Sequence, residues 1–289
     1  MFGITGIVFL VVMALFFVAV FARRQGDRPA TASRTLTTAV SVGVAATAII
    51  LFAFLIGSVL TGRAVASTPE RNAVPIQLIG HQWWWEVQYP NQIAARHVTT
   101  ANEIHLPIGR AIAFTVTSRD VIHSFWAPSL TGKRDLIPGY TTGLWVWVDT
   151  PGVYHGQCAE FCGRQHAHMG FDVVAEDDNE FEQWLAEQRR PALEPQQDEP
   201  IAGRALFMGQ RCSTCHMIRG TDANATLGPD LTHFASRETI GASARSNTPE
   251  HLAEWIRNPH ALKPGIQMPA TPLADADVHA LVAYLEGLK

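Results

Sequence analysis

The segment Cys158-Ala-Glu-Phe-Cys162-Gly-Arg-Gln-His166-Ala-His-Met169 is the part of the sequence from which the fold can be worked out. It places two thiols, an imidazole and a thioether within twelve residues. Thiolate and thioether ligands favour copper, zinc or iron–sulfur clusters, and imidazole suits zinc and copper. The methionine favours copper, because zinc sites use cysteine, histidine and carboxylate ligands. A zinc knuckle with a core methionine and a loop disulfide are the alternatives.

A further histidine on another segment supports the copper interpretation. His123 lies thirty-five residues before Cys158, in the strand-like stretch Val-Ile-His-Ser-Phe-Trp-Ala-Pro. At these spacings the candidate ligands resemble the dinuclear copper site, copper A, of cytochrome c oxidase subunit II. The resemblance runs from the N-terminus to about residue 180. Every position of its motif is filled, by His123, Cys158, Glu160, Cys162, His166 and Met169.

The resemblance implies a role for each of these residues. In the family both cysteine sulfurs bridge two coppers, one copper adds a histidine and the methionine, and the other adds a histidine and the glutamate's backbone carbonyl. The filled motif disfavours the copper-less quinol oxidase relatives. The carboxylate of Glu160 is implied to help bind a magnesium ion shared with the catalytic subunit, the alternative being a solvated or salt-bridged carboxylate. The other histidines of this region are expected at the surface or in hydrogen bonds: His81, His97, His105, His155 and His168.

Three adjacent tryptophans occur in Gly80-His-Gln-Trp-Trp-Trp85-Glu. Indole side chains favour the headgroup level of a membrane, so they could be interfacial anchors, and they could equally belong to a strand core. The stretch also resembles the aromatic segment of the same family, whose first tryptophan is the electron-entry residue above copper. That position is Trp83.

The first sixty residues of the sequence are strongly apolar. Hydrophobic residues make up 47% of the chain and charged residues only 17%. The runs Phe2–Ala22 and Ala39–Leu60 are each long enough to cross a bilayer. A cleaved signal peptide would need a basic n-region and a shorter apolar core, and no lysine or arginine precedes Phe2. We therefore expect a transmembrane hairpin over residues 1–66.

Charges set the orientation of this hairpin. Arginines fill the connection between the two runs: Arg23, Arg24, Arg28 and Arg34. The positive-inside rule makes that connection cytoplasmic and both ends of the chain extracytoplasmic, as in a multi-pass protein of a bacterial inner membrane. The net charges are +4 for residues 1–69, −4 for 70–178, −4 for 179–200 and zero for 201–289. No segment is basic enough to indicate nucleic-acid binding.

Short strand patterns follow over residues 70–178. Ala111–Thr117 and Gly143–Asp149 are rich in β-branched and aromatic residues, and Gly/Pro turns separate such segments. Many short strands between turns predict a β-sandwich or barrel. The family resemblance implies a cupredoxin-like Greek-key β-sandwich with the copper loop at one end.

An acidic, proline-rich linker is expected over residues 179–200. It begins with a short helix, Glu180–Arg190, and continues as Pro191-Ala-Leu-Glu-Pro-Gln-Gln-Asp-Glu-Pro200. Prolines and polar residues of this kind form an extended, semi-stiff tether.

The segment Cys212-Ser-Thr-Cys215-His216 is the attachment motif of c-type haem. The two thiols would form thioethers and His216 would be the proximal ligand, although an isolated CxxCH also occurs by coincidence or in zinc sites. Around it, Gly228-Pro-Asp-Leu and helices at Ile201–Gln210, from Thr248 and from Asp275 resemble class I cytochrome c. This implies an all-α domain over 201–289 in which the first and last helices cross at Gly203, Phe207 and Tyr284.

Met268, in Pro264-Gly-Ile-Gln-Met-Pro269, matches the family's sixth haem ligand. A methionine ligand raises the haem potential, which suits donation to a high-potential oxidase. The competing histidines are His233, His251, His260 and His279.

The sequence therefore predicts the electron-transfer subunit of a haem-copper terminal oxidase, with copper A, covalent haem c and a magnesium ion at the subunit I interface as cofactors. Its partners would be subunit I, other oxidase subunits and cytochrome c or another respiratory donor. A nitric oxide reductase subunit is the alternative within this class, with nitrous oxide reductase less favoured. A membrane-tethered copper-delivery or redox-sensing protein is the alternative from another class. The net-neutral haem domain is expected to dock near Trp83 and swing away between electron transfers.

Overall fold

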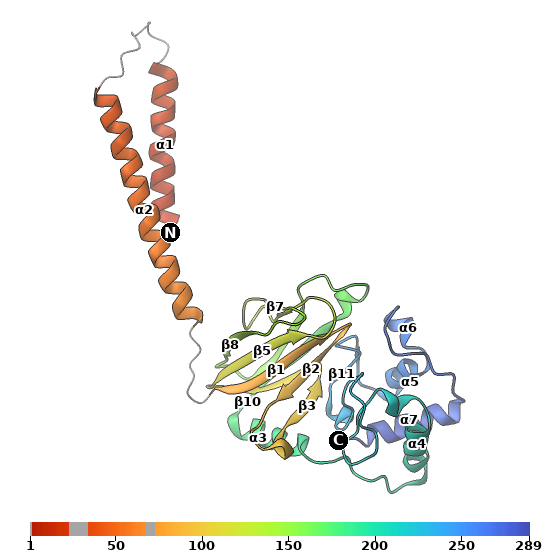
Figure 1. Ribbon diagram of the computed structural model, residues 1–289. Coiled ribbons are helices and arrows are strands. Elements are labelled where there is room, and N and C mark those ends of the chain that lie inside the picture. Colours follow the sequence, from red (N-terminus) through yellow and green to blue (C-terminus); the bar gives the residue numbers. More distant parts are fainter. Residues whose placement is uncertain (1, 23–33, 67–72) are drawn as a thin grey trace. The chain divides into compact units, whose positions relative to one another are not determined.

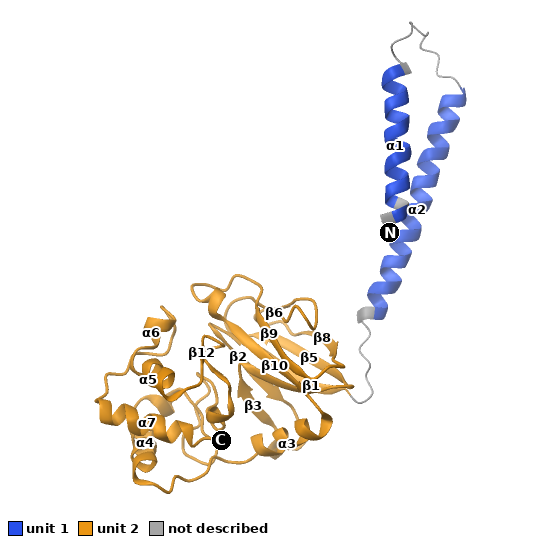
Figure 2. Ribbon diagram, turned by 180° about the vertical axis from the view of Figure 1, so that it is seen from behind, with its two compact units in different colours: residues 1–65 blue, residues 66–289 orange. Residues whose placement is uncertain are grey.

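The structure is a computed structural model that describes residues 2–22, 34–66 and 73–289. The chain divides into two compact units, residues 1–65 and 66–289 (Figure 2). The first unit contains the helices α1 (Phe2–Ala22) and α2 (Arg34–Ala66). Arg23, Arg24 and Arg28, on which the predicted orientation depends, lie outside the described residues.

The helix α2 is long and apolar enough to cross a membrane over Arg34–Ala64, and its side chains there are exposed to the surroundings rather than buried in protein. It starts earlier and ends later than the expected 39–60, because the threonines and alanines that flank the apolar run also continue the helix. The described apolar part of α1, Thr5–Phe21, is shorter.

The second unit begins with a β-sandwich, as predicted (Figure 1). One sheet has the strand order β3-β2-β1-β5-β8, and the other has the order β4-β10-β9-β6-β7. Parallel pairs, β1 with β5 and β10 with β4, stand among antiparallel ones, as crossovers between two sheets require. The strands are β1 (Val74–His81), β2 (Trp84–Tyr89), β3 (Val98–Ala101), β4 (Glu103–Pro107), β5 (Ala111–Ser118), β6 (His123–Trp126), β7 (Arg134–Leu136), β8 (Thr142–Trp147), β9 (Gly152–Cys158) and β10 (Gly170–Glu176).

One apolar core lies between the two sheets. Trp85, Phe114, Phe125 and Phe171 meet there, and Phe125 stacks on Phe171 with ring centroids 4.7 Å apart. Alternating buried side chains along each strand supply this core, which is the pattern of a sheet with one face covered. The loops that follow β5 and β9 lie near each other at one end of the sandwich, where His123 approaches Cys158.

The helix α3 (Asp178–Gln188) belongs to the sandwich rather than to a free linker. Phe181 and Leu185 are buried in the same core as the strands, and Asp177 caps the helix in a capping box with Glu180. The region 179–200, expected as a tether, therefore contains a packed helix. The residues after α3 are also bound: the backbone N–H of Ala192 donates to the carbonyl of Arg219 at 2.9 Å.

The last part of the chain is helical and has its own core. Its main helices are α4 (Asp198–Gly209), α5 (Pro249–Arg257), α6 (Pro259–Leu262) and α7 (Asp275–Glu286), with the short pair β11 (Thr239–Ile240) and β12 (Arg245–Ser246). Four 3₁₀ turns complete the described part of the second unit, residues 73–289: η1 (Ala94–Arg96), η2 (His166–His168), η3 (Cys212–Thr214) and η4 (Phe234–Ser236).

The predicted crossing of the first and last helices of this part is confirmed. A Cβ at Gly203 would lie 1.9 Å from the carbonyl oxygen of Ala280, so only glycine permits this approach. Phe207 packs edge-on against Tyr284 at 6.0 Å. The predicted start of α5 is also confirmed, with Thr248 as its N-cap and Pro249 in its first turn.

Candidate metal centre and haem site

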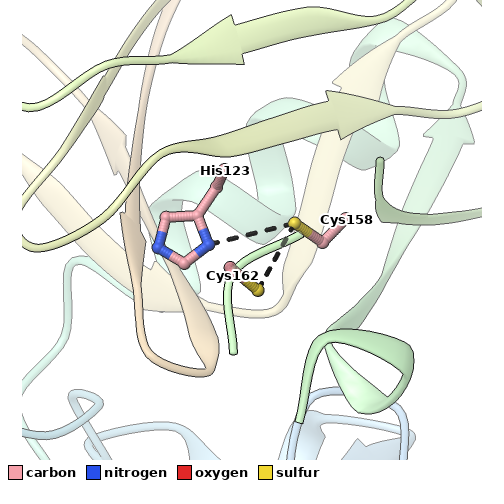
Figure 3. Close-up of side chains that lie close together, drawn as sticks. All are labelled: His123, Cys158 and Cys162. Atoms are coloured by element: carbon pink, nitrogen blue, oxygen red, sulfur yellow. Dashed lines mark hydrogen bonds between the residues drawn. The ribbon is translucent and has the colours of Figure 1, made fainter. Parts of the chain in front are cut away.

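The strand pairing brings His123 to the two cysteines (Figure 3). Phe125 of β6 pairs with Cys158 at the end of β9, and His123 lies two residues away on the same face of β6. The Cys158 sulfur lies 3.9 Å from His123 Nδ1 and 3.8 Å from the Cys162 sulfur. Both cysteines are free and buried, so the disulfide alternative does not describe this loop.

The remaining predicted ligands surround the same pair of sulfurs. His166 Nδ1 and Met169 Sδ lie 3.6 and 3.9 Å from the Cys162 sulfur. The backbone carbonyl of Glu160 lies 3.2 Å from the Cys158 sulfur. The structure thus brings together all six residues that the sequence singled out, and their sulfur, imidazole and carbonyl atoms suit copper.

The two thiols share one negative charge in this arrangement. The contact with Cys162, together with the hydrogen bond to His123, lowers the pKa of Cys158 to about 3, although burial opposes the shift. The same sulfur–sulfur contact and burial raise the pKa of Cys162. A thiolate is therefore already present at neutral pH, and a thiolate is the form that binds metals.

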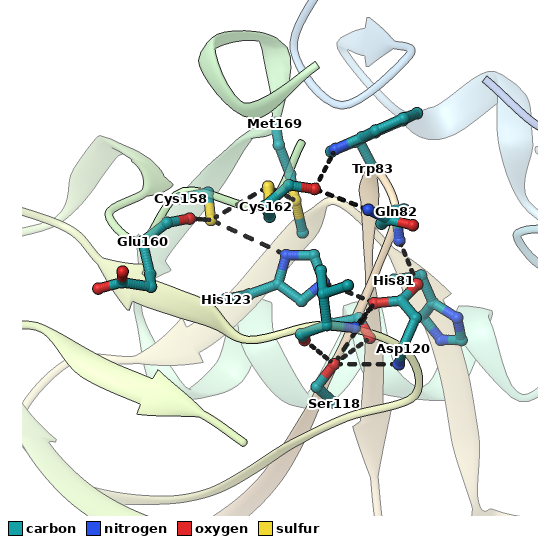
Figure 4. A network of polar contacts seen from close by, with 12 residues as sticks. His81, Gln82, Trp83, Ser118, Asp120, His123, Cys158, Glu160, Cys162 and Met169 are labelled. Atoms are coloured by element: carbon teal, nitrogen blue, oxygen red, sulfur yellow. Dashed lines mark hydrogen bonds and ion pairs between the residues drawn. The ribbon is translucent and has the colours of Figure 1, made fainter. Parts of the chain in front are cut away.

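Asp120 orients the ring of His123 (Figure 4). Its carboxylate lies 2.8 Å from His123 Nε2, which leaves Nδ1 directed at the cysteines. Burial raises the pKa of Asp120, but hydrogen bonds from His123 and from the backbone N–H groups of Val121 and Gln82 outweigh it and the net shift is downward. Sequence reasoning missed this residue; its position three residues before His123 was the available signal. Such outer contacts fix the tautomer of a metal-binding histidine.

Trp83 contacts the metal-binding loop directly. Its indole N–H donates to the carbonyl of Cys162 at 2.9 Å, and the side-chain amide of Gln82 donates to the same carbonyl at 2.7 Å. The neighbouring tryptophans differ: Trp85 is part of the sandwich core, and Trp84 stacks on His81. The core alternative is thus correct for Trp85, and Trp83 belongs to the same core while it contacts Cys162, so its role in electron entry stays a prediction.

The carboxylate of Glu160 is partly exposed and lies 3.7 Å from Lys133 Nζ. Four of the other histidines make hydrogen bonds, as expected. The pairs are His81 with Glu86, His105 with Glu103 and Glu176, His155 with Asp172, and His168 with Gln165.

The haem motif has a geometry that suits its predicted role. His216 Nδ1 donates to the carbonyl of Pro229 at 2.8 Å, which leaves Nε2 as a ligand atom. Burial lowers the pKa of His216 and keeps the ring neutral. A Cβ at Gly228 would lie 2.6 Å from the ring, so glycine is needed beside it. Cys212 and Cys215 are free for thioether formation.

Met268 lies half-buried in the loop between α6 and α7. One competing histidine is occupied elsewhere, since the two ring nitrogens of His233 lie 2.8 and 3.0 Å from the carbonyls of Lys289 and Arg190. Another, His251, has Nδ1 3.0 Å from the carbonyl of Ser246. Met268 as the sixth ligand remains a prediction.

Comparisons with known proteins match both parts of the second unit. The cytochrome c oxidase subunit II periplasmic domain matches residues 91–176, and the cytochrome c family matches residues 201–289. A cytochrome c oxidase subunit 2 of Alkalihalophilus pseudofirmus is 36% identical, over 99% of this chain and 84% of its own length. A cytochrome c oxidase subunit 2 of Bacillus sp. strain PS3 is 32% identical, over 76% of this chain and 64% of its own. The periplasmic domain of subunit II of cytochrome oxidase of Bradyrhizobium japonicum, a solved structure, is 28% identical over 43% of this chain and 96% of its own, with a TM-score of 0.39.

Proposed function

The chain belongs to the cytochrome c oxidase subunit II family with a fused cytochrome c domain, and from this premise we propose the route that electrons take through it. Electrons would enter at the helical domain, cross to the sandwich at Trp83 and leave for the catalytic subunit. Bound haem c and the copper pair would each supply one-electron redox chemistry. The observation that carries the proposal is the hydrogen bond from Trp83 to the Cys162 carbonyl, because Trp83 also contacts Lys263 of the helical domain and so joins that domain to a proposed copper ligand.

Each cofactor has a defined set of proposed ligands. The copper pair would be held by His123, Cys158, Cys162, His166, Met169 and the carbonyl of Glu160. The haem would be attached at Cys212 and Cys215, with His216 and Met268 as axial ligands. We further propose that the carboxylate of Glu160 contributes to a magnesium site shared with subunit I.

The domain boundaries and membrane orientation belong to the same proposal. We assign residues 1–66 to a hairpin in which both α1 and α2 cross the bacterial inner membrane, with the rest of the chain on the extracytoplasmic face. The copper-binding domain would extend from about residue 70 through α3, and the haem-binding domain would begin with α4. Residues 201–289 match the cytochrome c family. A copper-delivery protein would have no role for such a domain, so this match argues against that alternative.

A chain that ends after Arg190 tests this route. The cut keeps Phe181 and Leu185 of α3 in the sandwich core and removes the haem-binding domain. In stopped-flow experiments on the assembled oxidase, we expect the shortened chain to lose most of the rate at which the physiological donor reduces copper. Met268→Ala in the full chain should lose a comparable rate with an unchanged copper spectrum. Equal rates in the shortened and full chains, at one ionic strength, would show that the donor bypasses the haem. Oxygen and nitric oxide consumption by the same complex identifies the acceptor.

A further inference from the structure

Lys263 is buried between the helical domain and the sandwich. Its side chain is only 2% exposed, although it lies in the loop that carries Met268 five residues later. The ammonium donates to the carbonyl of Trp83 at 3.0 Å and to the carbonyl of Gly241 at 2.8 Å. One lysine thus connects the two domains at the proposed electron-entry residue.

Burying this ammonium is energetically costly. A lysine is rarely buried without an ionic partner, and within the described part of the chain no ion pair includes Lys263. Burial lowers the pKa of Lys263 to about 7. The surrounding contacts must offset this cost, and they would do so only while the domains are in contact.

The residues after Lys263 follow the metal-binding loop. The side-chain amide of Gln165, itself 4% exposed, donates to the carbonyl of Pro264 at 2.8 Å. Gly265 adopts a φ of +87°, and a Cβ there would lie 3.3 Å from Arg164. Ile266 packs against the core of the sandwich. The loop is therefore bound to Trp83 on one side and to the neighbour of His166 on the other.

The contact continues along the edge of the sandwich. The N–H of Gly170 donates to the carbonyl of Ala242 at 3.1 Å, and the hydroxyl of Ser243 donates to Asp172 at 3.1 Å. Farther along, the N–H of Glu238 donates to Glu103 at 3.3 Å. An interface with hydrogen bonds at several separate points holds one orientation better than a single contact can.

We propose that Lys263 is a positioning residue that fixes the Met268 loop on Trp83 and keeps the helical domain docked throughout turnover. The domain then does not swing on a tether between electron transfers. The consequence for electron transfer rests on the proposed function, whereas the docking itself does not.

The lysines of the chain offer a direct test of the docking. The chain has three: Lys133, Lys263 and Lys289. The Lys133 side chain is 53% exposed and Lys289 is exposed, so both report unhindered reactivity. A brief pulse of an amine-acylating reagent on the purified full-length chain with both cofactors, followed by peptide mass spectrometry, gives the three rates. We expect Lys263 to react at least about tenfold more slowly than the other two. A swinging domain would expose the amine, which would then regain the ordinary lysine pKa and react about as fast as the other two, and rates equal to or above those of Lys133 and Lys289 overturn the proposal.

Lys263→Met tests the positioning role, with Lys289→Met as the matched control. The substitution keeps the length and removes both donated hydrogen bonds. After pulsed reduction of the haem in the full chain, we expect electron transfer to copper to slow roughly tenfold or more, because small displacements of redox partners are costly. The copper and haem spectra should stay unchanged, which a general loss of folding would not allow. A wild-type rate in Lys263→Met refutes the positioning role. Failure of the wild-type chain to transfer electrons from haem to copper would instead refute the proposed function, while the labelling still reports on docking.

Discussion

At the scale of single residues, the two cysteines carry the strongest prediction. In the proposed site each sulfur would be shared by the two coppers, whereas His166 and Met169 each lie beside the Cys162 sulfur and would each bind one copper. Changing Cys158 or Cys162 to Ser should therefore abolish the many-line EPR signal of a valence-delocalised copper pair. His166→Ala or Met169→Ala should only perturb that signal. Metal analysis should find two coppers in each wild-type chain. A native spectrum in Cys162→Ser would contradict the bridged assignment.

A second residue-scale prediction concerns His105, which lies between Glu103 at 2.9 Å and Glu176 at 2.8 Å. Burial lowers its pKa, but the bonds to both carboxylates outweigh this and the net shift is upward. For Glu103, burial raises the pKa, yet the bond with His105 gives a net downward shift, so the carboxylate stays charged near neutrality. The charged pairing therefore stabilises the fold fully below about pH 6.5, the usual histidine value, and is lost as pH rises through the raised pKa of His105.

The measurement is thermal unfolding of the full chain between pH 6 and 9. The midpoint should fall as the pH rises. His105→Gln should flatten this dependence and cost about 1–3 kcal/mol at the acidic end, because a hydrogen-bonded charge is lost. His155→Gln is the control, since that side chain is 83% exposed. Identical pH profiles for the wild type and His105→Gln would contradict the assignment.

The clustering of the candidate ligand residues could be predicted from sequence, because few sites besides a copper centre combine two thiols, an imidazole and a thioether at this spacing. Asp120 and Lys263 could not. An aspartate before a histidine and a lysine in a loop are ordinary surface residues until the fold shows what they contact. Lys263 in particular contacts Trp83, which is 180 residues away in sequence.

At the scale of elements, the crossing of α4 and α7 offers a sharp comparison. Gly203→Ala would place a Cβ 1.9 Å from the Ala280 carbonyl, so the helices must separate. We expect a loss of about 1–3 kcal/mol in the stability of the helical domain, as for other overpacked cores. Gly209→Ala, at the end of α4 with open space around it, should be neutral or slightly stabilising. Thermal unfolding followed at the haem absorption band measures both, and equal stability of the two variants would argue against a close crossing.

Elements marked by local signals were predicted well. The N-cap Thr248 with Pro249 defines α5, and Asp275 opens α7, as their sequences indicate. The structure of residues 179–200 was harder to predict, because their composition indicates a tether and does not show that a helix there packs against the sandwich. Phe181 and Leu185 bind α3 to the sandwich, and this depends on an apolar surface that only the assembled sheets create.

At the scale of the whole molecule, composition and motifs predicted the order of the parts but not how the last two meet. Net charges of −4 and zero suggested weak attraction between sandwich and helical domain. The interface instead depends on individual side-chain and backbone contacts, such as those of Lys263, Gln165 and Ser243, and neither domain's composition reports them. The helical domain contacts Trp83 through Lys263, near the expected docking position, and the lysine-labelling experiment decides between permanent docking and the swinging motion expected from the sequence.

The last prediction concerns membrane orientation. The positive-inside rule places the arginines between the two apolar runs in the cytoplasm, and both termini on the outer face. A protease added to intact spheroplasts should then cut the segment after α3. We expect the cut within residues 193–197, because Leu193 is 76% exposed. The preceding residue, Ala192, is less accessible, because its backbone N–H donates to the carbonyl of Arg219.

If the helical domain stays docked on the sandwich, a cut in this segment should not release the haem-bearing fragment. Covalently bound haem stays on its fragment, so a denaturing gel stained for haem should show a fragment that begins near residue 194. Without denaturant, the contacts of Lys263 and Gln165 should keep that fragment on the membrane after cleavage. A cytoplasmic marker protein that remains intact serves as the control. Protection in spheroplasts, with cleavage only in inside-out vesicles, would reverse the orientation. A cut fragment that leaves at once would preserve the orientation and count against permanent docking.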